Sequence, residues 1–142
     1  MNKLRTVLAG LAIAGATVVA VPTAAQADGG CGYTNFCAYS DDHNYLYQNA
    51  GNSSSWPSQV KNKVDWVHNN GSAGGRDDVN IYWGDNNTGA YACIGYGTAW
   101  NLRTNTHTFN WTRNGDTRGH GERVHDNSAS HRWVYSCGNG TW

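Results

Sequence analysis

The sequence predicts an all-β domain, and three observations lead to that prediction. Apolar and polar residues alternate with a period of two in short segments such as 79–83 and 133–137. Clusters of Asp, Asn, Gly and Ser separate these segments at short intervals, as tight turns between strands require. Apart from 56–67, no segment keeps the apolar period of a helix without an interrupting glycine or asparagine. Many short strands joined by polar turns favour a β-sandwich or a β-barrel.

Two halves of the chain repeat one pattern. Residues 39–45 and 82–89 each follow a predicted strand and place an aromatic residue ahead of a polar hairpin. Each is followed by a polar turn before another aromatic segment, at 62–66 and at 126–130. The repetition predicts a duplicated four-stranded unit. The segments expected to form strands are 36–39, 64–67, 79–83, 91–94, 108–111 and 133–137.

The first 27 residues have the pattern of a signal peptide. Lys3 and Arg5 give a positively charged start, residues 7–21 are apolar or small, and Ala25 and Ala27 provide the small residues that a signal peptidase requires. The apolar run is shorter than the ~20 residues that span a bilayer. We therefore expect cleavage after Ala27, a single secreted domain formed by residues 28–142, and no membrane association after cleavage.

Removal of this leader leaves a weakly acidic chain. The full chain has ten Lys and Arg and ten Asp and Glu, and two of the cations lie in the leader, so the exported part carries eight against ten, a net charge of −2. A polyanion such as a nucleic acid has no electrostatic reason to bind a chain of this charge. We expect a monomer without a nucleic-acid partner.

All four cysteines, Cys31, Cys37, Cys93 and Cys137, fall in the exported part, where an oxidising environment allows thiols to pair. Two disulfides are therefore expected. Four cysteines allow three pairings, and the sequence alone does not choose among them. Proximity favours Cys31 with Cys37 and leaves Cys93 with Cys137, a bridge that would close the longer loop and stabilise the domain more.

The sequence lacks the usual motifs of catalysis. Glu122 is the only glutamate, no thiol stays free if all four cysteines pair, and neither a Gly-x-Ser-x-Gly elbow nor a Gly-rich phosphate loop occurs. His120 and His125 lie five residues apart, whereas a zinc-protease helix needs histidines four apart. With His107 and His131, they are expected to be solvated in loops rather than to hold a metal. We predict that the protein is not an enzyme.

Five segments, taken together, resemble a known family. They are Cys31 with Asn35–Tyr39, Val64–Asn70, Val79–Tyr82, Cys93–Leu102, and Asp126–Val134 ahead of Cys137. Their order and spacing resemble the secreted Streptomyces metalloproteinase inhibitor family over nearly the whole exported chain. The resemblance implies a βγ-crystallin-like β-sandwich, in which two Greek-key motifs pack face to face, here stabilised by disulfides.

The resemblance also implies a function and a site. In that family the inhibitory bond follows the third cysteine, which here corresponds to Cys93–Ile94, and Gly95 lets the chain turn afterwards. Ile94 would offer an apolar side chain to an extracellular, thermolysin-like metalloendopeptidase, while Cys93 anchors a substrate-like loop. The zinc belongs to the target enzyme, so no cofactor is expected in the inhibitor. The alternative is a structural half-cystine and a core isoleucine on a strand.

The same resemblance raises calcium binding as a second expectation. Crystallin-type sites use a turn of Asp or Asn followed by Ser or Thr, because a hard cation takes six to eight oxygen ligands. Asp126 and Ser130 fit that turn, but His131 replaces the last hydroxyl, and Lys63 occupies the acidic position of the first half. A plain turn is therefore favoured over a calcium site.

A carbohydrate-binding module and a crystallin-like secreted toxin are the alternatives from other classes. Seven tryptophans and many Asn, Asp and Gly residues resemble the composition of sugar sites, where aromatic faces stack and amides or carboxylates bind hydroxyls. The sequence contexts predict core positions for Trp66, Trp83, Trp111 and Trp133, and exposed positions for Trp56, Trp100 and Trp142. A fold of this kind supports several functions.

Overall fold

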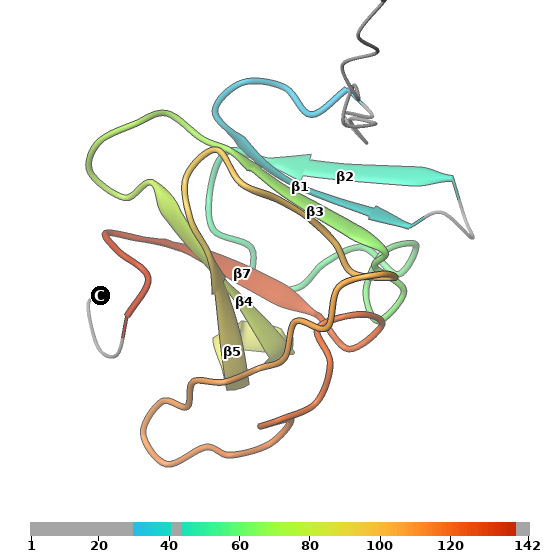
Figure 1. Ribbon diagram of the computed structural model, residues 1–142, viewed down its shortest axis with the longest axis vertical. Helices are drawn as coiled ribbons and strands as arrows, with labels where there is room; N and C mark the ends of the chain where they lie inside the picture. The colour runs from blue at the N-terminus through green and yellow to red at the C-terminus, as the bar shows by residue number, and fades with distance from the viewer. Residues whose placement is uncertain (1–29, 41–43, 139–142) are drawn as a thin grey trace, which may run out of the picture.

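Two antiparallel sheets form the structure, a computed structural model that describes residues 30–40 and 44–138 (Figure 1). The first sheet has the order β2 (Tyr45–Asn49), β1 (Asn35–Ser40), β3 (Trp66–Asn70) and β6 (Ala99–Asn101). The second has the order β5 (Thr88–Ile94), β4 (Asp78–Gly84) and β7 (Ser130–Val134). The prediction of an all-β fold is confirmed. The predicted leader and Trp142 lie outside the described residues.

The two halves of the chain exchange short segments between the sheets. β6 follows β5 in the chain but pairs with β3 of the first sheet, with Val67 opposite Trp100. In the other direction, Ser53 of the first half forms an antiparallel bridge with His131 of β7. Each sheet is therefore completed by a segment from the other half of the chain.

The core lies between the sheets and is largely aromatic and β-branched. Its fully buried members include Phe36, Trp56, Val67, Ile81, Ile94, Leu102, Phe109 and Val124. The central strand β4 is buried on both faces, since Val79 and Ile81 on one face and Asn80 and Tyr82 on the other are each at most 3% exposed. On the face opposite the core, the Tyr82 ring packs against that of Tyr91 with 5.4 Å between centroids.

Several predicted strands differ in extent from the observed ones. The segment 108–111 is not a strand, and its ladder pairing consists of isolated bridges from Thr108 to Arg123 and from Trp111 to Tyr91. The strand predicted at 64–67 begins at Trp66, and the one predicted at 133–137 ends at Val134. β2 and β6 carry no clear alternation and were not predicted. One turn of 3-10 helix, η1 (Asp85–Asn87), joins β4 to β5.

The expected exposure of two tryptophans is wrong. Trp56 is 2% exposed and packs on Phe36, because its indole N–H finds a buried acceptor in His131. Trp111, expected in the core, is 38% exposed, because its segment runs along the edge of β5 instead of within a sheet. Trp100 is half-buried against the core.

Disulfides close two loops, Cys31–Cys37 and Cys93–Cys137, and this is the pairing that proximity favours. The first ties the start of the described chain to β1. The second links the end of β5 to the segment after β7, across 44 residues. Within the described ranges, no helix has the length and apolarity needed to cross a membrane.

Candidate functional site

The predicted inhibitory bond lies at the end of β5. Cys93 is half-buried, and Ile94 is 0% exposed, opposite Val79 of β4 and inside the core cluster. An apolar side chain that fills the core cannot at the same time enter the pocket of another protein. The expectation that Ile94 is offered to a protease does not fit this conformation. The alternative, a half-cystine and a core isoleucine on a strand, describes Cys93 and Ile94 as they lie.

Directly after Ile94 the chain leaves the sheet in a tight turn, Gly95–Thr98. The Thr98 N–H donates to the Gly95 carbonyl at 3.2 Å, and Gly97 has a φ of 67°, the conformation that the third position of a type II turn requires. Tyr96, at the second position, is 46% exposed. Of the three predicted residues, Gly95 alone belongs to this turn, whose outermost side chain is that of Tyr96.

Asp78, at the start of β4, anchors one side of the turn. Its Oδ1 accepts a hydrogen bond from the Tyr96 N–H at 2.9 Å, and its Oδ2 accepts one from the Cys137 N–H at 2.6 Å. One carboxylate thus holds the turn and the C-terminal half-cystine together, beside the Cys93–Cys137 disulfide. Sequence reasoning missed Asp78, because nothing in its local pattern marks a carboxylate that serves two distant N–H groups.

Asn69 of β3 anchors the other side. Its side chain is fully buried, and its amide nitrogen donates to the Ile94 carbonyl at 3.2 Å. Its main chain takes part as well, with the N–H donating to Thr98 and the carbonyl accepting from Gly97, both at 2.9 Å. The turn is therefore hydrogen-bonded to strands of both sheets, and its backbone has little freedom to rearrange.

The two calcium candidates do not converge. Ser130 is fully buried, its hydroxyl donating to the Gly84 carbonyl at 2.6 Å and accepting from the Asn87 N–H at 3.2 Å. Asp126 instead faces His125, with its Oδ2 3.2 Å from Nδ1. Both oxygens that a cation would need already serve other partners.

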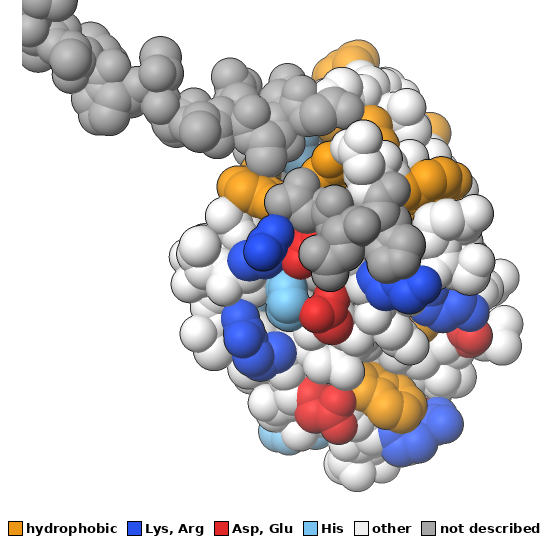
Figure 2. All heavy atoms as spheres, turned by 90° about the vertical axis from the view of Figure 1, so that its right-hand side faces the viewer, with side chains coloured by type: hydrophobic (Ala, Val, Ile, Leu, Met, Phe, Trp, Pro, Cys, Tyr) orange, Lys and Arg blue, Asp and Glu red, His pale blue; other side chains and the backbone are white. Residues whose placement is uncertain are grey.

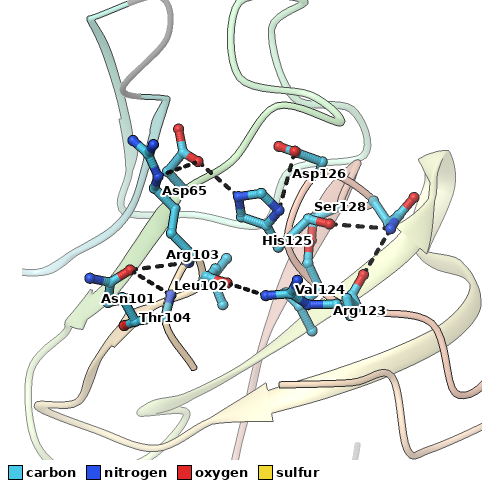
Figure 3. Close-up of polar contacts among 11 residues, drawn as sticks. Asp65, Asn101, Leu102, Arg103, Thr104, Arg123, Val124, His125, Asp126 and Ser128 are labelled. Atoms are coloured by element: carbon cyan, nitrogen blue, oxygen red, sulfur yellow. Dashed lines mark hydrogen bonds and ion pairs between the residues drawn. The ribbon is translucent and has the colours of Figure 1, made fainter. Parts of the chain in front are cut away.

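Asp65, His125 and Asp126 form a polar cluster that the sequence did not predict, because Asp65 lies 60 residues before His125 (Figure 3). The His125 ring lies between two carboxylates, with Nε2 2.9 Å from Asp65 and Nδ1 3.2 Å from Asp126. Arg103 adds a guanidinium, its Nε 3.9 Å from the Asp65 carboxylate, which is only 5% exposed.

One ligand atom from each of Asp65, His125 and Asp126 lies within 4.8 Å of the others, which is close enough for a metal ion, but the described conformation pairs them with one another. The two ring nitrogens of a histidine point in divergent directions, and here each already faces its own carboxylate. The cluster instead joins the segment before β3 to the segments that follow β6 and precede β7. A nearby bond from the Arg123 guanidinium to the Leu102 carbonyl, at 2.9 Å, joins two of the same segments (Figure 3).

Of the four histidines expected to be solvated, His120 is exposed, whereas His107 and His131 are less solvated than expected. His107 stacks on Trp100 at 4.0 Å between ring centroids, and its partial burial lowers its pKa. His131 is 0% exposed, with Nδ1 accepting from the Trp56 indole at 2.8 Å and Nε2 2.9 Å from the Gly51 carbonyl. Burial lowers the pKa of His131 to about 4. His131 is therefore a neutral core side chain rather than a solvated one.

Charged side chains on the face shown in Figure 2 are interspersed. Lys and Arg lie next to Asp, Glu and His, and neither sign of charge forms a continuous patch there. This face therefore carries no extended field of one sign.

Comparisons with protein-family models, with curated proteins and with solved structures find no match for this chain.

Proposed function

We propose that this protein is a secreted inhibitor of an extracellular, thermolysin-like metalloendopeptidase and that it contacts its target through the turn Gly95–Thr98. The class of target comes from the family that the sequence resembles. The contact surface comes from the geometry of the turn, and it replaces the bond after Cys93 as the proposed point of contact.

The fold proposed with it is a pair of βγ-crystallin-like Greek keys. The observation in support is the exchange of segments, since β6 joins the sheet of the first half and Ser53 bridges to β7 of the second. Secretion is part of the same proposal. It is supported by the leader-like residues 1–27 and by two disulfides, which persist mainly in oxidising compartments.

The observation that carries the proposal is an exposed tyrosine on a turn that is fixed in advance. Tyrosine is enriched among the side chains that dominate protein interfaces. Ordering a free side chain on binding costs about 0.5–1.5 kcal/mol, and ordering a loop costs more. The backbone around Tyr96 is already ordered by Asp78, Asn69 and the Cys93–Cys137 disulfide. Most of the free-energy cost of ordering a loop is therefore absent when the turn binds.

The same bonds explain how a bound turn resists cleavage. Hydrolysis requires the peptide to reach a near-attack geometry against the nucleophile. The turn would have to break its bonds to Asp78 and Asn69 to extend in the cleft. If one bond were cut, the Cys93–Cys137 bridge would hold the turn to the folded domain, which favours resealing over release.

Titration of a thermolysin-like protease with the exported domain tests the proposal. We expect stoichiometric inhibition, and Tyr96→Ala should weaken it by about thirtyfold or more, the effect of losing a dominant interface side chain. Asp78→Asn should weaken it less, because the amide keeps one acceptor oxygen. Tyr33→Ala, which removes another exposed tyrosine, is the matched control and should inhibit like the unchanged domain.

Two results would overturn the proposal. Absence of inhibition at micromolar concentrations of correctly disulfide-bonded protein would reject the function. Equal inhibition by Tyr96→Ala and Tyr33→Ala would reject the turn as the contact surface.

A further inference from the structure

A pocket of about 320 Å³ lies beside Trp133 of β7. Thr34, Asn52, Ser72 and Arg76 contribute polar side chains to its lining. It shares no lining residue with the turn Gly95–Thr98, so it is a separate feature of the surface. Its size lies near the lower end of the roughly 300–1,000 Å³ that small-molecule sites occupy.

Trp133 forms a fixed apolar part of this pocket. Its indole N–H donates to the Gly51 carbonyl at 3.0 Å, and its backbone N–H donates to the Asn52 Oδ1 at 2.9 Å. Gly71 packs so closely on the ring that an added Cβ would lie 2.7 Å from Cζ3. The side chain is 8% exposed and has no room to change rotamer.

The polar groups around Trp133 have hydrogen-bonding capacity left over. The Asn52 oxygen is used, whereas its amide nitrogen, the Thr34 and Ser72 hydroxyls and the Arg76 guanidinium have no hydrogen bond or ion pair with a described residue. The guanidinium lies over the Tyr135 ring, 5.2 Å from the centroid, which orients it without satisfying its N–H groups. The lining is therefore rich in donors.

Thr34 adds an independent observation. Its φ is 72°, a left-handed conformation that is rare for a β-branched residue. A hydrogen bond from its N–H to the Asn70 carbonyl, at 2.8 Å, and the Cys31–Cys37 bridge around it hold this conformation. Residues with strained backbone conformations are frequent at ligand sites, where the surrounding structure holds them in place.

We propose that this pocket binds a saccharide that carries a carboxylate, such as a uronate residue. The sugar packs on the part of Trp133 that the pocket exposes, its hydroxyls bond to Asn52 and to the hydroxyls of the lining, and its carboxylate pairs with Arg76. A guanidinium matches a carboxylate with two parallel hydrogen bonds, which a neutral sugar cannot form. This function goes beyond the proposed inhibition and does not depend on it.

Calorimetry of the exported domain with trigalacturonate and with neutral galactotriose tests the assignment. Trigalacturonate should bind, with nitrogen-edited NMR shifts centred on the Trp133 indole and the Arg76 side chain, and galactotriose should bind more weakly. Arg76→Gln should weaken trigalacturonate binding by about tenfold. Lys63→Gln removes the same charge from an exposed side chain outside the pocket and should leave the affinity unchanged.

Three results would overturn it. With the NMR spectrum showing a folded protein, no binding of trigalacturonate at millimolar concentration would reject the site. If Arg76→Gln and Lys63→Gln weakened trigalacturonate binding equally, the effect would come from overall charge and not from this pocket. Equal affinity for galactotriose would reject the carboxylate pairing. Protease inhibition by Arg76→Gln should stay unchanged in every case, so the two proposals fail separately.

Discussion

The indole N–H of Trp56 donates a hydrogen bond to Nδ1 of His131 at 2.8 Å, joining residues 75 apart in the chain. The other ring nitrogen of His131 lies 2.9 Å from the Gly51 carbonyl. Since Nδ1 accepts and Nε2 donates, the ring is neutral with its proton on Nε2. The pair links the first half of the chain to β7, and its geometry holds for one protonation state only.

The stability of the domain should therefore fall in mild acid. The pKa of His131 is about 4 in the folded state and about 6.5 in an unfolded chain. Between pH 6.5 and pH 4 the unfolded chain binds a proton at His131 that the folded chain excludes. The contribution of neutral His131 to the free energy of unfolding is therefore complete above pH 6.5 and falls as the pH is lowered towards 4. The loss should reach about 3 kcal/mol.

Urea unfolding at pH 7.5, 5.5 and 4 measures this dependence. His131→Gln keeps a donor and an acceptor at the position but does not titrate, so its free energy of unfolding should change less over the same range. An identical pH dependence in the two proteins would assign the loss to other groups.

Substitution of Ile94 should test its burial directly. Ile94→Val removes one buried methyl group and should cost about 1 kcal/mol of unfolding free energy. Ile94→Asp places a carboxylate in the core without a partner, at a cost of several kcal/mol, and should abolish folding. Chemical denaturation followed by tryptophan fluorescence measures both. An Ile94→Asp variant as stable as the parent would place this residue at the surface.

The two disulfides should differ in their contribution. Cys93–Cys137 closes a loop with a sequence separation of 44 and Cys31–Cys37 one with a separation of 6. On the chain-entropy model, replacing both cysteines of Cys93–Cys137 by alanine should lower the free energy of unfolding by about 4 kcal/mol. The same replacement at Cys31–Cys37 should lower it by about 2 kcal/mol. Thermal unfolding of the two double variants compares them. A larger loss from the shorter bridge would contradict the model for this domain.

Two glycines in one loop offer a matched pair. Gly119 and Gly121 have φ values of 74° and 82°, so alanine is strained at both positions. An added Cβ at Gly119 would overlap Cδ1 and Cγ of Trp83, whereas nothing lies within 4 Å of one at Gly121. Gly121→Ala should cost about 1 kcal/mol, and Gly119→Ala about 1–3 kcal/mol more because Trp83 must move. Equal urea midpoints for Gly119→Ala and Gly121→Ala would contradict this, because they would show that Trp83 moves aside at no cost in stability.

Local signals in the sequence identified much of the fold. Asn114 and Gly115 belong to one of the polar clusters that mark turns, and they have φ values of 52° and 76°, between the bridged residues Arg113 and Asp116. The alternation in 79–83 found the central strand. It did not reveal that both faces are covered, because the residues over the second face come from elsewhere in the chain.

The candidate site was identified only in part. The sequence pointed to residues 93–95, and the structure places the exposed turn immediately after them, with Tyr96 outermost. A register with a period of two decides which side of a strand each residue occupies, and here it turns Ile94 into the core. The anchoring role of Asp78 depends on contacts with Tyr96 and Cys137, which local patterns do not encode.

The sequence by itself determined the class of fold, the turns and the number of disulfides, because alternation, glycine and asparagine conformations and cysteine pairing are local or compositional properties. Only the tertiary structure decided that Trp56 is buried and Trp111 exposed, that Asp65 reaches His125, and that Thr34, Asn52, Ser72 and Arg76 surround one pocket. Burial and side-chain partners depend on which distant segment covers each face, and that is set by the packing of the two sheets.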